Sequence, residues 1–189
     1  MRTKQYNQTL RLCVVAMMAA MAYVVMVFVK IPLIPAVPFL TYEPKDVLLA
    51  LIALLIDPIA GVLATVAVAF VEMITVSATG LWGFLMNVLS SLAFLLPAAL
   101  LCRKKKTVVR VALGVACGVC VMTATMLLWN YLIVPLYMAM PRADVVPLLW
   151  SAFLPFNLIK GGINAALTFL LFKPAQSAFK AAKLTPADG

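Results

Sequence analysis

The chain has 189 residues, of which 66% are hydrophobic and only 11% are charged, and its mean hydropathy is +1.11. An ordinary soluble domain carries about 25% charged residues, so the composition excludes that class and predicts an integral membrane protein with one domain over residues 1–189. The net charge of +9 does not indicate nucleic-acid binding, because the basic residues lie at the ends of apolar segments.

Six apolar segments follow one another, and we interpret each as a transmembrane helix of an all-α fold. They cover residues 10–29, 46–56, 58–76, 81–101, 108–134 and 150–172. The first is too long for the apolar region of a signal peptide and is followed by no A-x-A-like cleavage site, so we expect it to remain in the mature chain. The second is short for a bilayer, which about 20 helical residues cross, unless it begins deep in the membrane.

The connections between these segments predict an orientation. The first loop, KIPLIPAVPFLTYEPKD, contains four prolines, so we expect it to be irregular. Basic residues gather within residues 2–11, 103–110 and 173–183, which all fall on one side of a six-span arrangement. The positive-inside rule then predicts that both termini are cytoplasmic and that the first loop lies outside.

Polar residues recur inside the predicted spans, where each must find a partner or line a cavity. In the last span Asn157, Lys160, Gly161 and Asn164 have the spacing i, i+3, i+4, i+7, which places them on one helix face. Lys160 lies far from either end of this span. A buried partner or a ligand is therefore favoured over extension of its side chain to the interface.

The fourth and fifth predicted spans also carry polar groups, and each group has two possible interpretations. The fourth span presents one face that contains Gly80, Gly83, Asn87, Ser90 and Ser91, which suits either ordinary helix packing or a cavity wall. Asn130 stands between two aromatic residues near the predicted outer end of the fifth span. The aromatic residues suit an interfacial belt, whereas an amide beside them also suits a planar, hydrogen-bonding ligand.

Acidic residues lie near the same predicted outer side. Glu72 is near the end of the third span, and Glu43 and Asp46 are in or next to the first loop. These carboxylates are candidates to pair with Lys160 or to contact a ligand. For Glu43 and Asp46, however, we expect solvated loop charges or a helix N-cap formed by Asp46.

Several chemistries are excluded or disfavoured. The chain has no histidine, which removes histidine-based catalysis and histidine metal sites, and it has no phosphate-binding loop of an ATPase. No two of its six acidic residues share a span with proton-relay spacing, so an ion-driven transporter is poorly supported. We expect a membrane protein without cofactor, metal or catalytic activity, whose polar-lined pocket depends on a partner for energy.

The motifs PFLTYEPKDV, TGLWGFLMNVLSS, WNYLIVPLY and PFNLIKGGIN occur in this order over most of the chain. With them the chain resembles the substrate-binding S components of energy-coupling factor (ECF) transporters, most closely the riboflavin-specific ones. The resemblance implies capture of riboflavin from outside, with Asn130, Asn157 and Lys160 as polar contacts and the first loop closing over the ligand. The complete set of candidate substrate-binding residues is Asn130, Asn157, Lys160, Asn87, Asn164, Glu72, Leu40, Thr41 and Tyr42.

Riboflavin is uncharged, so Lys160 would donate a hydrogen bond to a carbonyl or hydroxyl group of the ligand, or would be neutralised by Glu72. The resemblance also implies a membrane coupling subunit and two cytoplasmic ATPases as partners in the bilayer. Ala16 and Ala20 have the small-xxx-small spacing that lets another helix approach closely, and we expect them to contact the coupling subunit. Packing within the chain is the other interpretation of these alanines.

Three alternatives stay open. The chain is an S component for another vitamin or for a flavin such as FMN, it is an autonomous ion-coupled secondary transporter, or it is an assembly protein whose polar stripe only joins helices. Bound flavin separates the first alternative from the riboflavin hypothesis. Ion-driven substrate uptake into liposomes without ATPases would favour the second alternative. Substitutions of Lys160 and Asn157 that destabilise the fold but leave ligand affinity intact would favour the third.

Overall fold

The computed structural model describes residues 2–34, 40–77, 79–103 and 105–182. The helices in these ranges are α1 (Arg2–Phe28), α2 (Lys45–Leu55), α3 (Pro58–Thr75), α4 (Gly80–Leu101), α5 (Val108–Tyr137), α6 (Arg142–Leu148) and α7 (Leu154–Ala181). A π-helical segment (Leu149–Phe153) joins α6 to α7, and two short strands, β1 (Ile31–Pro32) and β2 (Thr41–Tyr42), follow α1. Part of the proline-rich first loop lies outside the described residues. So do the basic residues 104 and 183, which contribute to the predicted orientation.

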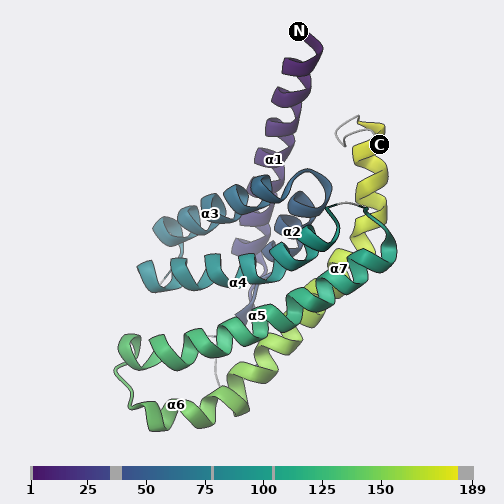
Figure 1. The fold of residues 1–189 in the computed structure, drawn as a ribbon. Helices are drawn as coiled ribbons and strands as arrows, with labels where there is room; N and C mark the ends of the chain where they lie inside the picture. The colour runs from purple at the N-terminus through teal and green to yellow at the C-terminus, as the bar shows by residue number, and fades with distance from the viewer. Residues whose placement is uncertain (1, 35–39, 78, 104, 183–189) are drawn as a thin grey trace.

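The predicted all-α membrane fold is confirmed. Residues 142–181 continue as one helical stretch through the π-helical segment, so the described residues contain six helical stretches (Figure 1). Five of these six are long and apolar enough to cross a membrane, namely Gln8–Phe28, Pro58–Thr75, Gly80–Leu101, Val108–Leu136 and Arg142–Ala181. The sixth, α2, has 11 residues and is shorter than a bilayer is thick.

The short helix α2 lies in the centre of the protein. It packs against α1, α3, α4 and α7, and all of its residues except Leu48 are buried. Its backbone and side chains are therefore surrounded by protein rather than by lipid. This position explains how a helix of 11 residues is accommodated, and it places the first turn of α2 in the interior.

Close packing of α4 against α5 depends on glycine. A Cβ atom on Gly118 would lie 2.3 Å from the carbonyl oxygen of Phe94, and one on Gly114 would lie 2.8 Å from the Cα atom of Ala98. These distances leave no room for a side chain, so the two backbones approach each other directly. The hydrophobic effect is weak between helices in lipid, so small residues stabilise such a crossing by allowing close van der Waals contact.

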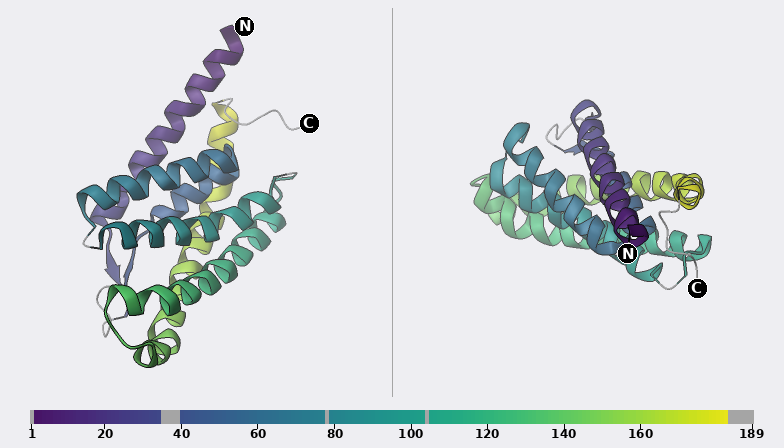
Figure 2. Two further views of the ribbon diagram at one scale, coloured as in Figure 1. Left: turned by 60° about the vertical axis from the view of Figure 1, so that its left-hand side comes forward. Right: turned by 90° about the horizontal axis from the view of Figure 1, so that it is seen from above.

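The polar contacts divide the molecule into two ends. Arg11 donates to the carbonyl oxygen of Ile56 at 3.0 Å and Lys106 donates to that of Leu55 at 3.0 Å, so α1, the end of α2 and the α4–α5 connection meet at one end. At the other end Tyr23 of α1 donates to Thr75 of α3 at 2.9 Å. The start of α1 and the end of α7 lie toward the same end, and α6 lies at the opposite end (Figures 1 and 2).

Two segments differ from expectation. The described part of the first loop is not wholly irregular, because β1 and β2 pair antiparallel with Ile31 opposite Tyr42 and Pro32 opposite Thr41. A proline is compatible with this pairing because the ribbon has only two strands, both of them edges. The last helical stretch extends beyond residues 150–172 at both ends, and its π-helical segment ends just before Pro155, which has no N–H to donate to the preceding turn.

Candidate functional site

A cavity opens at the end of the molecule that holds the hairpin, the start of α4 and the end of α5. It contains about 570 Å³ of empty space, counting the part open to solvent. We call it the aromatic pocket. Its walls are Leu40, Thr79, Trp82, Gly83, Met86, Trp129, Asn130, Ile133, Val134, Met138 and Phe153.

Helical spacing explains how two elements supply most of these walls. Trp82, Gly83 and Met86 lie on one face of the first turns of α4, and residues 129, 130, 133 and 134 lie on one face of α5. Gly83 lacks a Cβ atom, which would lie 1.9 Å from the Oγ1 atom of Thr79. Glycine at this position therefore lets the side chain of Thr79, another wall of the pocket, lie against the first turn of α4.

Asn130 is the buried polar group in this pocket. It is 6% exposed, and its side-chain amide makes no hydrogen bond with another described residue. The Asn130 amide is not among the fully enclosed polar groups that lack a partner, so it reaches open space, and it carries both donors and an acceptor. An unpaired amide in the wall of a cavity is therefore positioned to hydrogen-bond a ligand there.

A second feature is a buried polar network centred on Asp46, which we call the Asp46 network. The Oδ2 atom of Asp46 lies 3.4 Å from the Nζ atom of Lys160 and accepts a hydrogen bond from Asn164 at 3.2 Å. Its Oδ1 atom accepts from Ser91 at 2.5 Å, and Tyr42 donates to the side-chain oxygen of Asn164 at 3.0 Å. The network thereby joins β2, α2, α4 and α7 in the interior.

The hydroxyl group of Tyr42 keeps its proton in this setting. Burial raises the pKa of Tyr42 to about 12, and the negative charge of Asp46 adds to the increase. Tyr42 is therefore neutral at physiological pH and acts as a donor to Asn164.

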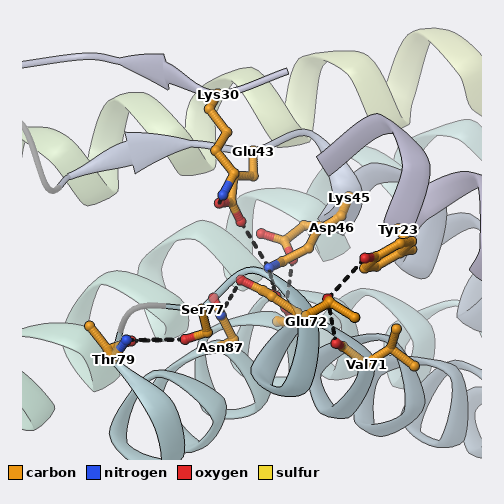
Figure 3. A network of polar contacts seen from close by, with 12 residues as sticks. Tyr23, Lys30, Glu43, Lys45, Asp46, Val71, Glu72, Ser77, Thr79 and Asn87 are labelled. Atoms are coloured by element: carbon orange, nitrogen blue, oxygen red, sulfur yellow. Dashed lines mark hydrogen bonds and ion pairs between the residues drawn. The ribbon is translucent and has the colours of Figure 1, made fainter. Parts of the chain in front are cut away.

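Next to this network lies the Lys45 cluster, drawn in Figure 3. Lys45 is 1% exposed and contacts two carboxylates, donating to Glu43 at 2.9 Å and pairing with Glu72. Asn87 donates to the other oxygen of Glu72 at 2.8 Å. Lys30, whose side chain is 40% exposed, lies 3.9 Å from Glu43. The cluster attaches the base of the hairpin to α3 and α4.

These contacts correct two expectations. Glu43 and Asp46 are not solvated loop charges, because they are 9% and 1% exposed, and Asp46 is not an N-cap, because Pro44 is the residue before α2 and no side chain caps that helix. Neutralisation of Lys160 by Glu72 is also wrong. Glu72 is paired with Lys45, and Asp46 is the carboxylate next to Lys160. The reason for both is that α2 starts in the protein interior.

The predicted site residues thus fall into separate places. Asn130 and Leu40 line the aromatic pocket, whereas Lys160, Asn164 and Tyr42 belong to the Asp46 network. Glu72 and Asn87 belong to the Lys45 cluster.

Asn157 donates to the backbone oxygen of Phe153, a pocket residue, at 2.7 Å, and half-buried Thr41 lies in β2. The sequence reasoning missed Lys45 and Asp46 as interior charges and missed the tryptophan and methionine walls. The short length of α2 is the signal that its first turn is interior.

The two alanines predicted to contact a partner helix are both exposed on α1. This helix packs mainly on α2 and α3, and its outer side also exposes Leu12, Met17, Met21 and Val24. The contacts within the chain thus leave the Ala16 and Ala20 side of α1 uncovered.

Comparisons with known proteins agree over nearly the whole chain. The family described as "ECF transporter, substrate-specific component" matches residues 10–172. A solved structure described as "Structure and mechanism of the S component of a bacterial ECF transporter" is similar with a TM-score of 0.77 and 27% identity, over 92% of this chain and 99% of that chain. A comparison with curated proteins finds no significant match.

Proposed function

The chain belongs to the family of substrate-specific components of ECF transporters, and from this premise we propose that its substrate is riboflavin. As a member of this family it is a non-catalytic, multi-pass subunit of an importer in the cell membrane, and it pairs with a module that contains a membrane coupling subunit and ATPases. The substrate is thus the part of the function that must be argued from the residues.

The unpaired amide of Asn130 in the aromatic pocket carries the proposal. The isoalloxazine ring of riboflavin has flat, largely apolar faces and an edge of carbonyl and N–H groups. Indole and methionine side chains suit the faces, and a buried amide suits the edge because it supplies both donor and acceptor. The four motifs that resemble riboflavin-specific S components include this asparagine and both tryptophan walls.

The remaining candidate residues act around this contact. The ammonium group of Lys160 has three donors, and its pairing with Asp46 leaves donors for a carbonyl or hydroxyl group of riboflavin. We propose Asn157 as a further polar contact of α7, and Leu40, Thr41 and Tyr42 as the part of the first loop that closes over the ligand. Asn164 supports this site by holding Tyr42 and Asp46 with the two ends of its amide. Glu72 and Asn87 complete the set by holding the base of that loop through Lys45.

We further propose that the aromatic pocket faces outside and that both termini are cytoplasmic. Support comes from the distribution of charge, since Arg11, Arg103, Lys106 and Arg110 lie in the half of the molecule opposite the pocket. An excess of arginine and lysine marks the cytoplasmic ends of transmembrane helices. Riboflavin then enters from outside, as an importer requires.

The coupling subunit is proposed to dock on α1. Ala16 and Ala20 are exposed there, one turn apart, and their small side chains allow the backbone of a second helix to come close. A helix face that this chain leaves uncovered is available to the coupling subunit, whereas the aromatic pocket at the end of the molecule stays free for the substrate.

The proposal is tested by titrating riboflavin with the purified protein and following the quenching of flavin fluorescence. Asn130→Ala is expected to weaken binding by about 5- to 150-fold, which corresponds to the roughly 1 to 3 kcal/mol of an unsatisfied polar partner. Thr123→Val is the matched control, because Thr123 is equally buried on the same helix and its hydroxyl group has no partner among the described residues. The control is expected to bind like the wild type.

Three results would contradict the proposal. The first is failure of the wild-type protein to quench riboflavin fluorescence. The second is riboflavin binding by Asn130→Ala that is as tight as binding by Thr123→Val, and the third is displacement of riboflavin by another vitamin at lower concentration. Displacement by FMN at lower concentration than riboflavin would assign the pocket to the phosphorylated flavin instead. Riboflavin uptake by liposomes that contain this chain alone would reassign it to autonomous transport.

A further inference from the structure

A second hollow lies at the end of the molecule opposite the aromatic pocket, where α4 ends and α5 begins. It contains about 820 Å³ of empty space, counting the part open to solvent, and we call it the arginine hollow. Its lining consists of Leu100, Leu101, Arg103, Arg110 and Leu113. Two guanidinium groups and three leucines thus share one depression, and none of the described residues that line it is a carboxylate.

The positive charge of this hollow is uncompensated within the described chain. Neither guanidinium group forms an ion pair or a hydrogen bond with another described residue. The first turn of α5 contains no acidic residue, so the positive end of its helix dipole adds to the field. Arg103 also lines a neighbouring hollow together with Asp57, but the two form no ion pair, and Asp57 accepts hydrogen bonds from the backbone of α3 at 2.9 and 3.3 Å.

The leucines of the hollow face outward. Leu100, Leu101 and Leu113 are 57%, 48% and 61% exposed, although they belong to the two helices that pack most closely in the structure. Because α1 packs mainly on α2 and α3, it leaves this part of α4 and α5 uncovered. Arg103 follows the end of the candidate span Gly80–Leu101, and Arg110 lies in the first turn of the candidate span Val108–Leu136, so both arginines are at the ends of apolar helices that expose leucines.

We propose that the arginine hollow binds an anionic phospholipid, with its phosphate on Arg103 and Arg110 and its acyl chains along the three leucines. Guanidinium groups bind phosphate oxygens in pairs with defined geometry, and basic hollows at the ends of transmembrane helices suit anionic head groups. A free phosphate would use the charge but not the leucines. An acidic protein segment would likewise gain little from an apolar wall that faces the bilayer.

The test measures lipid binding to the purified protein by native mass spectrometry, with phosphatidylglycerol and phosphatidylcholine of the same chain length. The wild type is expected to retain phosphatidylglycerol preferentially. Arg103→Gln with Arg110→Gln is expected to lower phosphatidylglycerol affinity by about tenfold and leave phosphatidylcholine unaffected. Arg103→Lys with Arg110→Lys keeps the charge and loses the paired geometry, so its phosphatidylglycerol affinity is expected to lie between those of the wild type and the double glutamine variant.

The matched control is Lys105→Gln with Lys173→Gln, which removes the same charge from two exposed residues outside the hollow. An equal loss of phosphatidylglycerol in this control would overturn the proposal, because the attraction would then be unspecific. Displacement of the lipid by inorganic phosphate would show a free-anion site, and tighter binding of an acidic peptide would assign the hollow to a protein partner. Both results would also overturn it.

Discussion

Asp46→Asn is the substitution that most directly tests the buried network. It keeps the shape of the side chain and removes the charge that faces Lys160. The ammonium group of Lys160 would then remain in the interior, because its residue is 7% exposed, and the other carboxylates nearby, those of Glu43 and Glu72, are held by Lys45. A buried charge that loses its partner destabilises a fold far more than an exposed one.

The expected loss follows from the geometry. Removal of one partner of a buried ion pair costs about 3–5 kcal/mol, and the lower value applies here because the amide can still bond Ser91 and the side chain of Lys160 is 9% exposed. For a chain of this size, about 3 kcal/mol lowers the melting temperature by roughly 6–12 °C. Asp46→Asn with Lys160→Met removes both charges and is expected to recover most of the loss.

The measurement is thermal unfolding in detergent without riboflavin, followed by tryptophan fluorescence. Asp144→Asn is the control, since Asp144 is an exposed acidic residue of α6 and its removal is expected to shift the midpoint by less than about 4 °C. The reasoning is refuted if Asp46→Asn melts within the range of this control. It is also refuted if the double variant is less stable than Asp46→Asn alone.

Three further predictions concern other parts of the chain. Ala16→Leu or Ala20→Leu is expected to leave riboflavin affinity unchanged and to abolish ATP-driven uptake in the reconstituted transporter, because a bulky side chain keeps the coupling subunit away from α1. Gly118→Ala is expected to destabilise the fold by about 1–3 kcal/mol in thermal unfolding, since its Cβ atom would lie 2.3 Å from a backbone oxygen. Stability is expected to fall as the pH rises from about 10 to about 12, because folded Tyr42 holds its proton in this interval while the unfolded chain loses it.

Each of these predictions has its own control. Uptake that persists in the alanine variants at wild-type rates would contradict docking on α1. Gly162→Ala has open space around its Cβ position and is expected to be neutral or stabilising, so an equal loss at both glycines would contradict close packing of α4 and α5. Tyr42→Phe is expected to reduce the pH dependence in this interval, and an unchanged profile would contradict the assignment to this residue.

Long apolar segments predict the helices of this protein because each long helix meets lipid, and hydropathy reports that contact directly. Helical spacing correctly singles out Lys160 and Asn164 as one buried polar face, since both follow the helical repeat and both are buried. It also points to Asn130 as a candidate ligand contact from its aromatic neighbours. These features are local in the sequence.

The partners of these residues are not local, and the sequence names Asp46 only as one of three carboxylates that could pair with Lys160. Asp46 is 114 positions from Lys160 and reaches it only because α2 is an interior helix surrounded by four others. Assigning Glu43 and Asp46 to a solvated loop assumed that α2 begins at the membrane surface. Its length of 11 residues already contradicts that assumption, and a short apolar helix with charges in its first turn indicates an interior start.

The most direct test of the proposed substrate is the absorbance spectrum of the protein purified from its cell membrane without added vitamin. We predict a yellow preparation with flavin absorbance bands, about one flavin per chain, and release of riboflavin rather than FMN on denaturation. Asn130→Ala is predicted to lose most of this flavin during purification, and Thr123→Val to keep it. A colourless wild-type preparation that also fails to bind added riboflavin would contradict the account.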